Sequence, residues 1–311
     1  MKYIQTDNKP LSAMTIGTVQ LGMNYGIANN AGKPDEEKSF AMLRAAFENG
    51  ITALDTARAY GDSEDIIGRF LKTWEGETPY IATKVRKFPE GEENVEKIVL
   101  SSVEESLEKL GVKKVNTIML HSPVDLLAHG PKVSAAMERL LKMGYTDRIG
   151  VSVYKADEIE EMLRYPSFSV TQVPMSIFDQ RLIASGTVKK LKDTNYTVFV
   201  RSVFLQGLFF LDPDTVTDPI LALHAVPKIR MLRQIAASEG MTVAQLAIAF
   251  MRDTVGVTSL VLGADTPEQV KENIAYFDAP TLSDSVMEKI REGFAEVDIP
   301  AIMTVLSRPK A

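Results

Sequence analysis

Short apolar runs alternate with longer, helix-patterned segments over most of the chain. Eight of the apolar runs have the composition of buried strands. They begin at Ala13, Ile51, Tyr80, Asn116, Arg148, Ser169, Thr197 and Ser259. Because polar or helix-patterned residues separate each run from the next, the pattern predicts a repeated strand–helix unit.

The helical segments show apolar residues that recur every three or four positions. In the clearest, 92–110, the residues Val95, Ile98, Val99, Val103, Leu107 and Leu110 share one face, and Gly111 follows as a C-cap. Further helices are expected at 36–49, 63–72, 132–143, 155–163, 185–192 and 267–276. Strands that alternate with helices predict parallel pairing, and eight such units fit a closed (β/α)8 barrel, the TIM-barrel architecture.

An open, doubly wound sheet is the alternative to a barrel. In dinucleotide-binding sheets of that kind a GxGxxG motif follows the first strand. Here the first run leads instead into GMNYG at 22–26. The eight units and the lack of that motif favour the barrel, and the lack of a linker or low-complexity segment predicts one domain over 1–311.

Three segments lie outside the repeated strand–helix units. Residues 1–12 precede the first strand, and we expect them to cap the floor of the barrel. The long segment 205–226 follows the seventh strand. We expect it to shape the substrate pocket, as loops at the carboxyl ends of barrel strands do. From about residue 283 we expect one more helix and then an irregular tail.

The composition excludes several classes of protein to which the chain could belong. The chain has 311 residues, 45% of them apolar and 24% charged, as is typical of soluble globular proteins. The net charge of −6 argues against a nucleic-acid partner. The lack of cysteine excludes disulfides and thiol chemistry and suits the cytoplasm. The first residues lack the apolar region of a secretory signal, and no apolar stretch is long enough to span a bilayer, so we expect no membrane partner.

Polar side chains stand where three successive strands end. Asp55 ends the second strand, Lys84 the third and His121 the fourth, and Tyr60 lies in the loop after the second. Taken singly, Asp55 fits a turn cap, Lys84 a lysine that reaches solvent, His121 a core histidine and Tyr60 loop packing. Because the active sites of barrels lie at the carboxyl ends of their strands, the four together predict one site.

These residue types fit proton transfer to a carbonyl oxygen. A free tyrosine has a pKa of about 10, and a nearby ammonium favours the phenolate and lowers that pKa. A buried lysine tends to lose its proton, so Lys84 needs a carboxylate, which Asp55 would supply. His121 could hold a substrate oxygen or relay a proton. We therefore expect Tyr60 to have a lowered pKa and to act as a general acid.

Motifs in a fixed order along nearly the whole chain resemble those of the aldo-keto reductases, a family of NAD(P)-dependent barrels. They are GTVQLGMNYG (17–26), DTARAYGDSE (55–64), ATK (82–84), LHSP (120–123), GVS (150–152), Gln172 in TQVPMSIFDQR, FLQGLF (204–209) and VLGADTPEQVKEN (261–273). Each motif is weak by itself, whereas the ordered set is specific.

The resemblance implies a catalytic group of Tyr60, Asp55, Lys84 and His121, in which Tyr60 gives a proton in reduction and takes one in oxidation. Hydride would come directly from the nicotinamide, with no metal. The implied cofactor-binding residues are Ser152 and Gln172 for the carboxamide, Arg201 and Ser202 at the end of the seventh strand, Leu205 and Gly207 for the pyrophosphate, and Gly263, Asp265, Gln269 and Asn273 for the adenosine half.

Three positions depart from the family pattern. Val153 stands where the family usually has Asn, so one carboxamide contact is lost or replaced. Arg201 stands where an aromatic residue often stacks on the nicotinamide. Its guanidinium could stack, bind an anionic substrate group or form a salt bridge at the rim. Asp265 stands where relatives that prefer NADP carry Lys or Arg. NADP is the family default, but this acid favours NAD or dual use, while Lys228 and Lys271 are candidate phosphate contacts.

The resemblance predicts an oxidoreductase that moves hydride between NAD(P)H and an aldehyde, ketone or sugar-type carbonyl or alcohol. Tyr25, Asn24, Phe178 and His129 are candidates for a polar mouth that suits a small, sugar-like substrate. Two alternatives stay open: a cofactor-binding, redox-sensing regulatory subunit with slow turnover, and a Schiff-base aldolase that uses Lys84. The three histidines form no HxH pair, which disfavours a metal hydrolase. The sequence does not define the direction of the reaction or the oligomeric state.

Overall fold

Each of the eight predicted runs forms a strand, and the strands close into a parallel barrel. The structure is a computed structural model of the whole chain, and it describes residues 1–6, 9–27, 29, 32–91 and 93–308. The barrel strands are β3 (Met14–Gly17), β4 (Ala53–Asp55), β5 (Tyr80–Val85), β6 (Val115–Leu120), β7 (Thr146–Ser152), β8 (Phe168–Pro174), β9 (Thr197–Arg201) and β10 (Ser259–Leu262). They pair in chain order, and β10 lies between β9 and β3. The predicted (β/α)8 barrel is confirmed.

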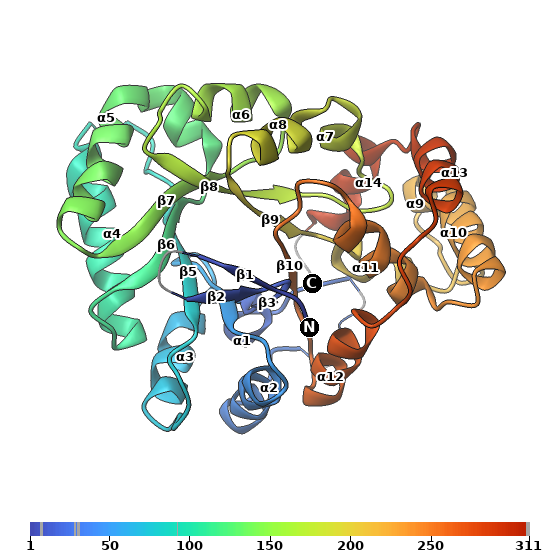
Figure 1. Cartoon of the computed structure of the whole chain (residues 1–311), viewed down its shortest axis with the longest axis horizontal. Coiled ribbons are helices and arrows are strands. Elements are labelled where there is room, and N and C mark those ends of the chain that lie inside the picture. Colours follow the sequence, from blue (N-terminus) through green and yellow to red (C-terminus); the bar gives the residue numbers. More distant parts are fainter. Residues whose placement is uncertain (7–8, 28, 30–31, 92, 309–311) are drawn as a thin grey trace.

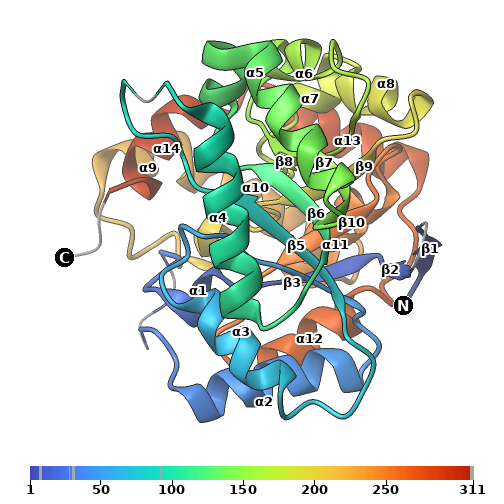
Figure 2. The same cartoon turned by 90° about the vertical axis from the view of Figure 1, so that its left-hand side faces the viewer.

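Helices surround the barrel (Figure 1), and Figure 2 shows α4 across its outside. The helices are α1 (Val19–Gly22), α2 (Glu36–Glu48), α3 (Ser63–Leu71), α4 (Val95–Leu110), α5 (Pro123–Lys142), α6 (Ala156–Met162), α7 (Arg181–Ala184), α8 (Thr187–Asp193), α9 (Pro219–His224), α10 (Val226–Ser238), α11 (Val243–Asp253), α12 (Pro267–Tyr276), α13 (Asp284–Phe294), α14 (Ile299–Leu306) and the 3-10 helix η1 (Leu205–Phe210). The six apolar residues predicted to share a face of α4 are buried, and the left-handed Gly111 ends the helix. None of the described helices is long and apolar enough to cross a membrane.

The N-terminal hairpin covers the floor of the barrel, as predicted. It consists of β1 (Tyr3–Gln5) and β2 (Pro10–Ser12), which pair antiparallel. The backbone N–H of Ser12 donates to Thr52 just before β4 at 2.9 Å, and the hydroxyl of Ser259 at the start of β10 donates to the Ser12 carbonyl at 2.8 Å. Leu11 is fully buried with inward-facing barrel residues such as Tyr80 and Phe199. Figure 2 shows the hairpin at one end of the barrel and α9 and α14 at the other.

Two segments differ from their predictions. Segment 205–226, expected as a loop, contains η1 and α9. The tail, expected to be irregular, forms α14, which Asp298 caps by accepting from the Ala301 N–H at 2.9 Å. Pro300 lies in the first turn of α14. A proline there removes no helical hydrogen bond, so it does not break the helix. In Figure 1, α9, α10, α13 and α14 lie together at the right of the barrel.

Candidate active site

Asp55 and Lys84 form a buried ion pair at the carboxyl ends of β4 and β5. Their side chains are 3% and 0% exposed. Lys84 Nζ donates to the two carboxylate oxygens of Asp55 at 2.7 and 2.8 Å, and to the carbonyl of Thr56 at 3.0 Å. These hydrogen bonds fix the ammonium of Lys84 and the carboxylate of Asp55 in one relative position inside the barrel.

The phenol of Tyr60 lies against this ion pair. Lys84 Nζ is 3.4 Å from the Tyr60 hydroxyl oxygen and 4.9 Å from the centroid of its ring. The ring of His121, the residue after β6, meets the Tyr60 ring edge to face with centroids 5.6 Å apart. The structure thus brings together the four residues that the strand ends and the resemblance singled out.

Burial decides the ionisation of these groups. Burial raises the pKa of Tyr60 above its ordinary value of 10.0, and the charges of Lys84 and Arg201 only partly oppose this effect. The predicted net lowering of that pKa is wrong, because burial disfavours the phenolate more than the two cations favour it. Burial lowers the pKa of Lys84, but Asp55 and Tyr60 together outweigh burial and raise that pKa above its ordinary value of 10.5. Burial, followed by the charges of Lys84 and Arg201, lowers the pKa of His121 to about 4. At neutral pH the site holds a phenol, an ammonium and a neutral imidazole.

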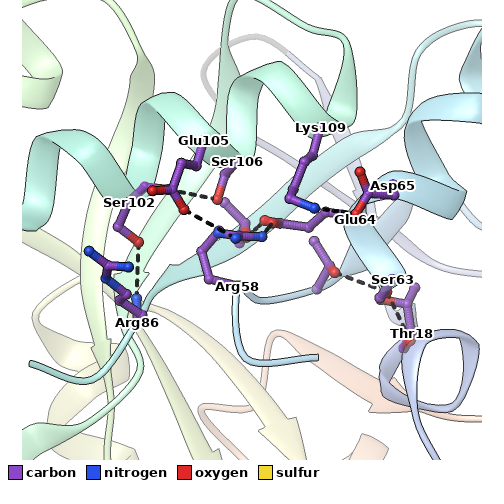
Figure 3. Close-up of polar contacts among 12 residues, drawn as sticks. Thr18, Arg58, Ser63, Glu64, Asp65, Arg86, Ser102, Glu105, Ser106 and Lys109 are labelled. Atoms are coloured by element: carbon purple, nitrogen blue, oxygen red, sulfur yellow. Dashed lines mark hydrogen bonds and ion pairs between the residues drawn. The ribbon is translucent and has the colours of Figure 1, made fainter. Parts of the chain in front are cut away.

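Arg58 anchors the loop that carries Tyr60 (Figure 3). Its guanidinium donates to Glu64 on α3 at 2.7 Å and to Glu105 on α4 at 3.2 Å. The Glu64 side chain is 1% exposed and also accepts from the Thr83 hydroxyl on β5 at 2.7 Å. Loop 56–62 is therefore tied to two helices and a barrel strand, which limits the positions open to the Tyr60 hydroxyl.

The opposite side of the site carries polar atoms without partners. Gln172 on β8 donates its Nε2 to Asp55 at 2.8 Å, whereas its buried Oε1 has no donor in the described part of the chain. Arg201, the last residue of β9, lies with its guanidinium 4.5 Å from the centroid of the Tyr154 ring. One terminal nitrogen of Arg201 is buried without an acceptor among the described residues. The rim salt bridge considered for Arg201 is not formed with any described residue.

The chain turns sharply after β9. Ser202, Leu205 and Gln206 have left-handed backbone with φ of 64°, 46° and 56°, and Gly207 follows with φ of 92°. Non-glycine residues with such backbone are strained and concentrate at ligand sites, and turns of this kind present backbone N–H groups to anions. Ser202, Gln206 and Gly207 line the cavity described below, whereas Leu205 is buried behind it.

Gly263, directly after β10, lies against the side-chain amide of Gln20 on α1. A Cβ atom at Gly263 would lie 2.1 Å from Gln20 Nε2, so only glycine fits while that amide keeps its place. The Oε1 of Gln20 is buried and has no donor among the described residues. The sequence motifs pointed to Gly263, and the motif at 17–26 contains Gln20, but Gln20 was not singled out as a site residue.

The start of α12 supplies the other end of the site. The backbone N–H of Asp265 donates to Gln269 Oε1 at 2.7 Å, and Asn29 Nδ2 donates to Asp265 Oδ1 at 3.2 Å. Asn273 Nδ2 donates to the Gly263 carbonyl at 3.3 Å. The structure therefore places the four residues assigned to the adenosine half next to one another.

One cavity of about 450 Å³ joins the two ends. Asp55, Tyr60, Gln172 and Arg201 line one end, and Gly263, Asp265, Gln269 and Asn273 line the other. Lys84 and His121 are not among the lining residues. Lys84 is fully buried against Asp55, whereas His121 is partly exposed and lies beside the Tyr60 ring. Ser152 is buried beside Gln172, its neighbour in strand register.

The cavity fits a nicotinamide dinucleotide. The unpartnered Oε1 of Gln172 suits the N–H groups of a carboxamide, the left-handed turn after β9 suits a pyrophosphate, and the groove at Gly263 has no room for a side chain. Val153, the departure from the family pattern beside Ser152, is fully buried in the core. It therefore supplies no polar group to the carboxamide end. Among the described residues, no cluster of three or more potential ligands could hold a metal ion.

Part of the predicted mouth lies elsewhere. Tyr25 lines the cavity, but Asn24, Phe178 and His129 do not. Phe178 is 1% exposed and stacks on Phe294, and His129 packs against Phe88. Neither Lys228 nor Lys271 lines the cavity, and Lys228 donates to the Gly293 carbonyl at 2.8 Å.

The barrel, the buried lysine–aspartate pair beside a tyrosine and the cavity that joins the two ends of the site fit a dinucleotide-dependent oxidoreductase. The model of the aldo/keto reductase family matches residues 13–293. The chain belongs to the aldo/keto reductase family, as the motifs predicted, and it is an NAD(P)-dependent oxidoreductase.

Similar proteins cover nearly the same length. L-glyceraldehyde 3-phosphate reductase of Escherichia coli (strain K12) is 24% identical, over 96% of this chain and 93% of that protein. NADH-specific methylglyoxal reductase of the same strain is 27% identical, over 92% of this chain and 96% of that protein. The structure of a glycerol dehydrogenase from Gluconobacter oxydans superposes with a TM-score of 0.77 and 21% identity, over 99% of this chain and 97% of the other. That likeness shows the fold.

Proposed function

We propose that this protein reduces a small carbonyl compound, or oxidises the matching alcohol, with Tyr60 as the general acid and base. The observation that supports this most is the position of the Lys84 ammonium. It is held by Asp55 at 2.7 Å and reaches the Tyr60 oxygen at 3.4 Å. An ammonium fixed beside a phenol stabilises the phenolate that proton transfer leaves behind.

The nicotinamide of the bound cofactor supplies hydride in reduction and accepts it in oxidation. Tyr60 donates its proton to the carbonyl oxygen as negative charge develops there. Lys84 stabilises the resulting phenolate, and Asp55 keeps Lys84 protonated. His121, neutral at pH 7 because its pKa is about 4, donates a hydrogen bond to the same oxygen and orients it. In oxidation the Tyr60 phenolate takes the proton of the alcohol.

We assign the cofactor along the cavity. Gln172 and Ser152 hold the carboxamide, the backbone from Ser202 to Gly207 holds the pyrophosphate, and Gly263, Asp265, Gln269 and Asn273 hold the adenosine half. We expect NAD(H) to be preferred, because Asp265 and Glu272 line the adenosine end and none of the described lining residues there is Lys or Arg. An acid repels a 2′-phosphate and suits a 2′-hydroxyl. A relative named as NADH-specific supports the same preference.

The substrate is expected to be small and polar. The relatives named for glyceraldehyde 3-phosphate and for methylglyoxal act on small carbonyl compounds. Tyr25, Tyr60 and Gln172 offer polar groups at the nicotinamide end. We place the enzyme in the cytoplasm and treat the chain as one domain.

A panel of aldehydes, ketones and sugars, followed by the absorbance of NADH and NADPH, tests this function. We expect Tyr60→Phe to lower kcat about 10²- to 10⁴-fold with little change in NADH affinity, measured by fluorescence titration. Tyr145→Phe is the matched control, since its hydroxyl contacts exposed Glu104 outside the barrel, and it should keep full activity. Full activity in Tyr60→Phe would show that another group donates the proton.

The substrate panel and a borohydride-trapping experiment separate the proposed function from the two alternatives. A regulatory subunit would retain the cofactor tightly but turn over slowly on every compound. An aldolase would be trapped by borohydride as an adduct on Lys84 in the presence of a carbonyl compound. We expect no adduct, because Asp55 holds Lys84 as an ammonium, which cannot attack a carbonyl.

A further inference from the structure

Arg201 is the one cation among the described residues that line the cavity. The other charged lining residues are Asp55, Asp265 and Glu272. Asp55 is paired with Lys84, and the other two acids lie at the adenosine end. Although the chain has a net charge of −6, the end of the cavity next to Tyr60 therefore presents an uncompensated positive charge.

The contacts of Arg201 leave part of the hydrogen-bonding capacity of its guanidinium unused. One face lies on the Tyr154 ring at 4.5 Å, and a terminal nitrogen is buried without an acceptor in the described part of the chain. The N–H groups of a guanidinium point outward in its own plane. Neither the Tyr154 ring nor a nicotinamide stacked on the opposite face can accept those hydrogen bonds. A buried donor without an acceptor is costly, so a ligand atom in the plane would complete the site.

The lining of the cavity places Arg201 beside the groups of the proposed reaction. Burial is the main influence on the pKa values of Tyr60, Tyr25 and His121, and the charge of Arg201 acts on all three. Tyr60 and His121 surround the reacting carbonyl in the proposed function. The left-handed turn that suits the pyrophosphate directly follows Arg201 in the chain. Arg201 lines the cavity at the same end as Tyr25 and Tyr60, which is the substrate end in the proposed function.

We propose that Arg201 binds an oxyanion of the substrate, a carboxylate or a phosphate, carried on the same small molecule as the reacting carbonyl. The inference rests on the proposed function, because Tyr60 sets the place of the carbonyl. A guanidinium pairs with either oxyanion through two parallel, charge-assisted hydrogen bonds. The phenol of Tyr25 lines the same end and offers a further donor. The substrate class is thus an oxo acid or a phosphorylated aldehyde or sugar.

Matched pairs of substrates test this proposal. The pairs are 4-oxobutanoate with butanal, and glyceraldehyde 3-phosphate with glyceraldehyde. In the wild type we expect a higher kcat/KM for the anionic member of at least one pair. Arg201→Met keeps a long side chain against Tyr154 but removes the charge, and we expect it to lower the ratio of anionic to neutral kcat/KM about 10- to 100-fold, mainly through KM. Arg201→Lys, which keeps the charge without the fork, should restore part of the ratio.

Two further measurements separate the possible outcomes. Arg69→Met removes an exposed arginine that pairs with Glu36 on the barrel exterior, and it should leave the ratio unchanged. Calorimetry of succinate and of inorganic phosphate with the NADH-loaded protein reports oxyanion binding without turnover, and we expect Arg201→Met to abolish it. An unchanged ratio in Arg201→Met, or a loss of NADH affinity as large as the change in the ratio, would overturn the proposal. The second result would assign Arg201 to the cofactor pyrophosphate.

The failure of this inference is distinct from the failure of the proposed function. If the wild type reduces the neutral compounds as well as the anionic ones, and binds neither succinate nor phosphate, the oxyanion site is wrong and the reductase stands. If no compound is reduced but Arg201-dependent binding of succinate or phosphate is measured, the oxyanion site stands and the proposed reaction is wrong.

Discussion

The two sides of the cavity differ in how far the protein satisfies its own polar groups. On the paired wall, formed by β4, β5 and loop 56–62, Lys84 has acceptors in Asp55 and Thr56, and Asp55 accepts from Lys84 and Gln172. On the open wall, formed by α1, β8, β9, β10 and the start of α12, Gln20, Gln172 and Arg201 each keep a buried polar atom without a partner in the described part of the chain. They account for three of the four such atoms there, and the fourth, on Arg58, lies outside the cavity lining.

This difference distinguishes polar groups that are paired when the chain folds from polar groups that are paired only when a ligand binds. A buried polar atom without a partner costs about 1–3 kcal/mol. Three such atoms belong to residues that line one cavity, and this indicates that a ligand completes them. The paired wall is completed by folding itself. Substitutions in the paired wall are therefore expected to change stability as well as chemistry, whereas substitutions in the open wall should mainly change which ligands bind.

The largest effect is expected from Lys84→Met, which breaks the paired wall. It leaves the Asp55 carboxylate, 3% exposed, without its cation. Removing one partner of a buried ion pair destabilises a protein by roughly 3–5 kcal/mol. We expect a loss of that size in the free energy of unfolding, measured by urea denaturation, together with loss of turnover.

A double variant isolates the charge from the packing. Lys84→Met combined with Asp55→Asn removes both charges, so we expect it to be more stable than Lys84→Met alone while it remains inactive. Equal stability of the single and double variants would show that the cost of Lys84→Met comes from lost packing and not from an unpaired carboxylate.

The fold was predictable from the sequence wherever the pattern of apolar residues matches the burial of the element in the barrel. The apolar runs at Tyr80 and Thr197 begin strands because each fits a strand that is buried on both faces. The tail was expected to be irregular, whereas it forms α14 with Pro300 in its first turn. Whether a proline starts or stops a helix depends on its position after the cap, and Asp298 provides that cap. The helix α14 packs against α9, and this long-range contact has no signature in the sequence.

The residues of the paired wall were predictable from the sequence, whereas part of the open wall was not. Asp55 and Lys84 end adjacent strands, so order along the chain was enough to place them together. Gln20, although it lies in the motif at 17–26, and Tyr154 were not singled out as site residues. Gln20 meets Gly263 because the barrel closes between β10 and β3, and Tyr154 meets Arg201 from the loop after β7. The rise in the pKa of Tyr60 was also missed, since residue types show which charges are near but not how deeply a phenol is buried.

A smaller effect, on pH dependence, is expected from His121 beside the paired wall. Burial, Lys84 and Arg201 lower its folded pKa to about 4, from an ordinary 6.5. The unfolded chain therefore binds more protons between these values, and stability is lost as pH falls through this window. Because His121 is partly exposed, we expect it to account for about 2 kcal/mol of lost stability between pH 7 and 4.5.

Comparison with His121→Gln at each pH isolates this contribution. Burial raises the pKa of Asp125 to about 6, so Asp125 acts in the opposite sense and stabilises the folded chain as pH falls through the same window. Because Asp125 is present in both proteins, its effect cancels in the difference. A wild type and variant that lose equal stability between pH 7 and 4.5 would show that His121 is readily protonated in the folded state.

The smallest effect is expected at the far end of the open wall, where Asp265→Asn removes a charge but keeps the oxygen that accepts from Asn29. At about 4 Å in water two unit charges interact by about 1 kcal/mol. We therefore expect kcat/KM with NADPH to rise roughly fivefold relative to NADH, with little change in urea stability. Glu268→Gln makes the same change in net charge on α12 outside the cavity lining, and it should leave the NADH to NADPH ratio unchanged. If Asp265→Asn destabilised the fold without shifting that ratio, Asp265 would be a group that stabilises the folded chain and does not select the cofactor. The contrast between the two walls would then not extend to the adenosine end.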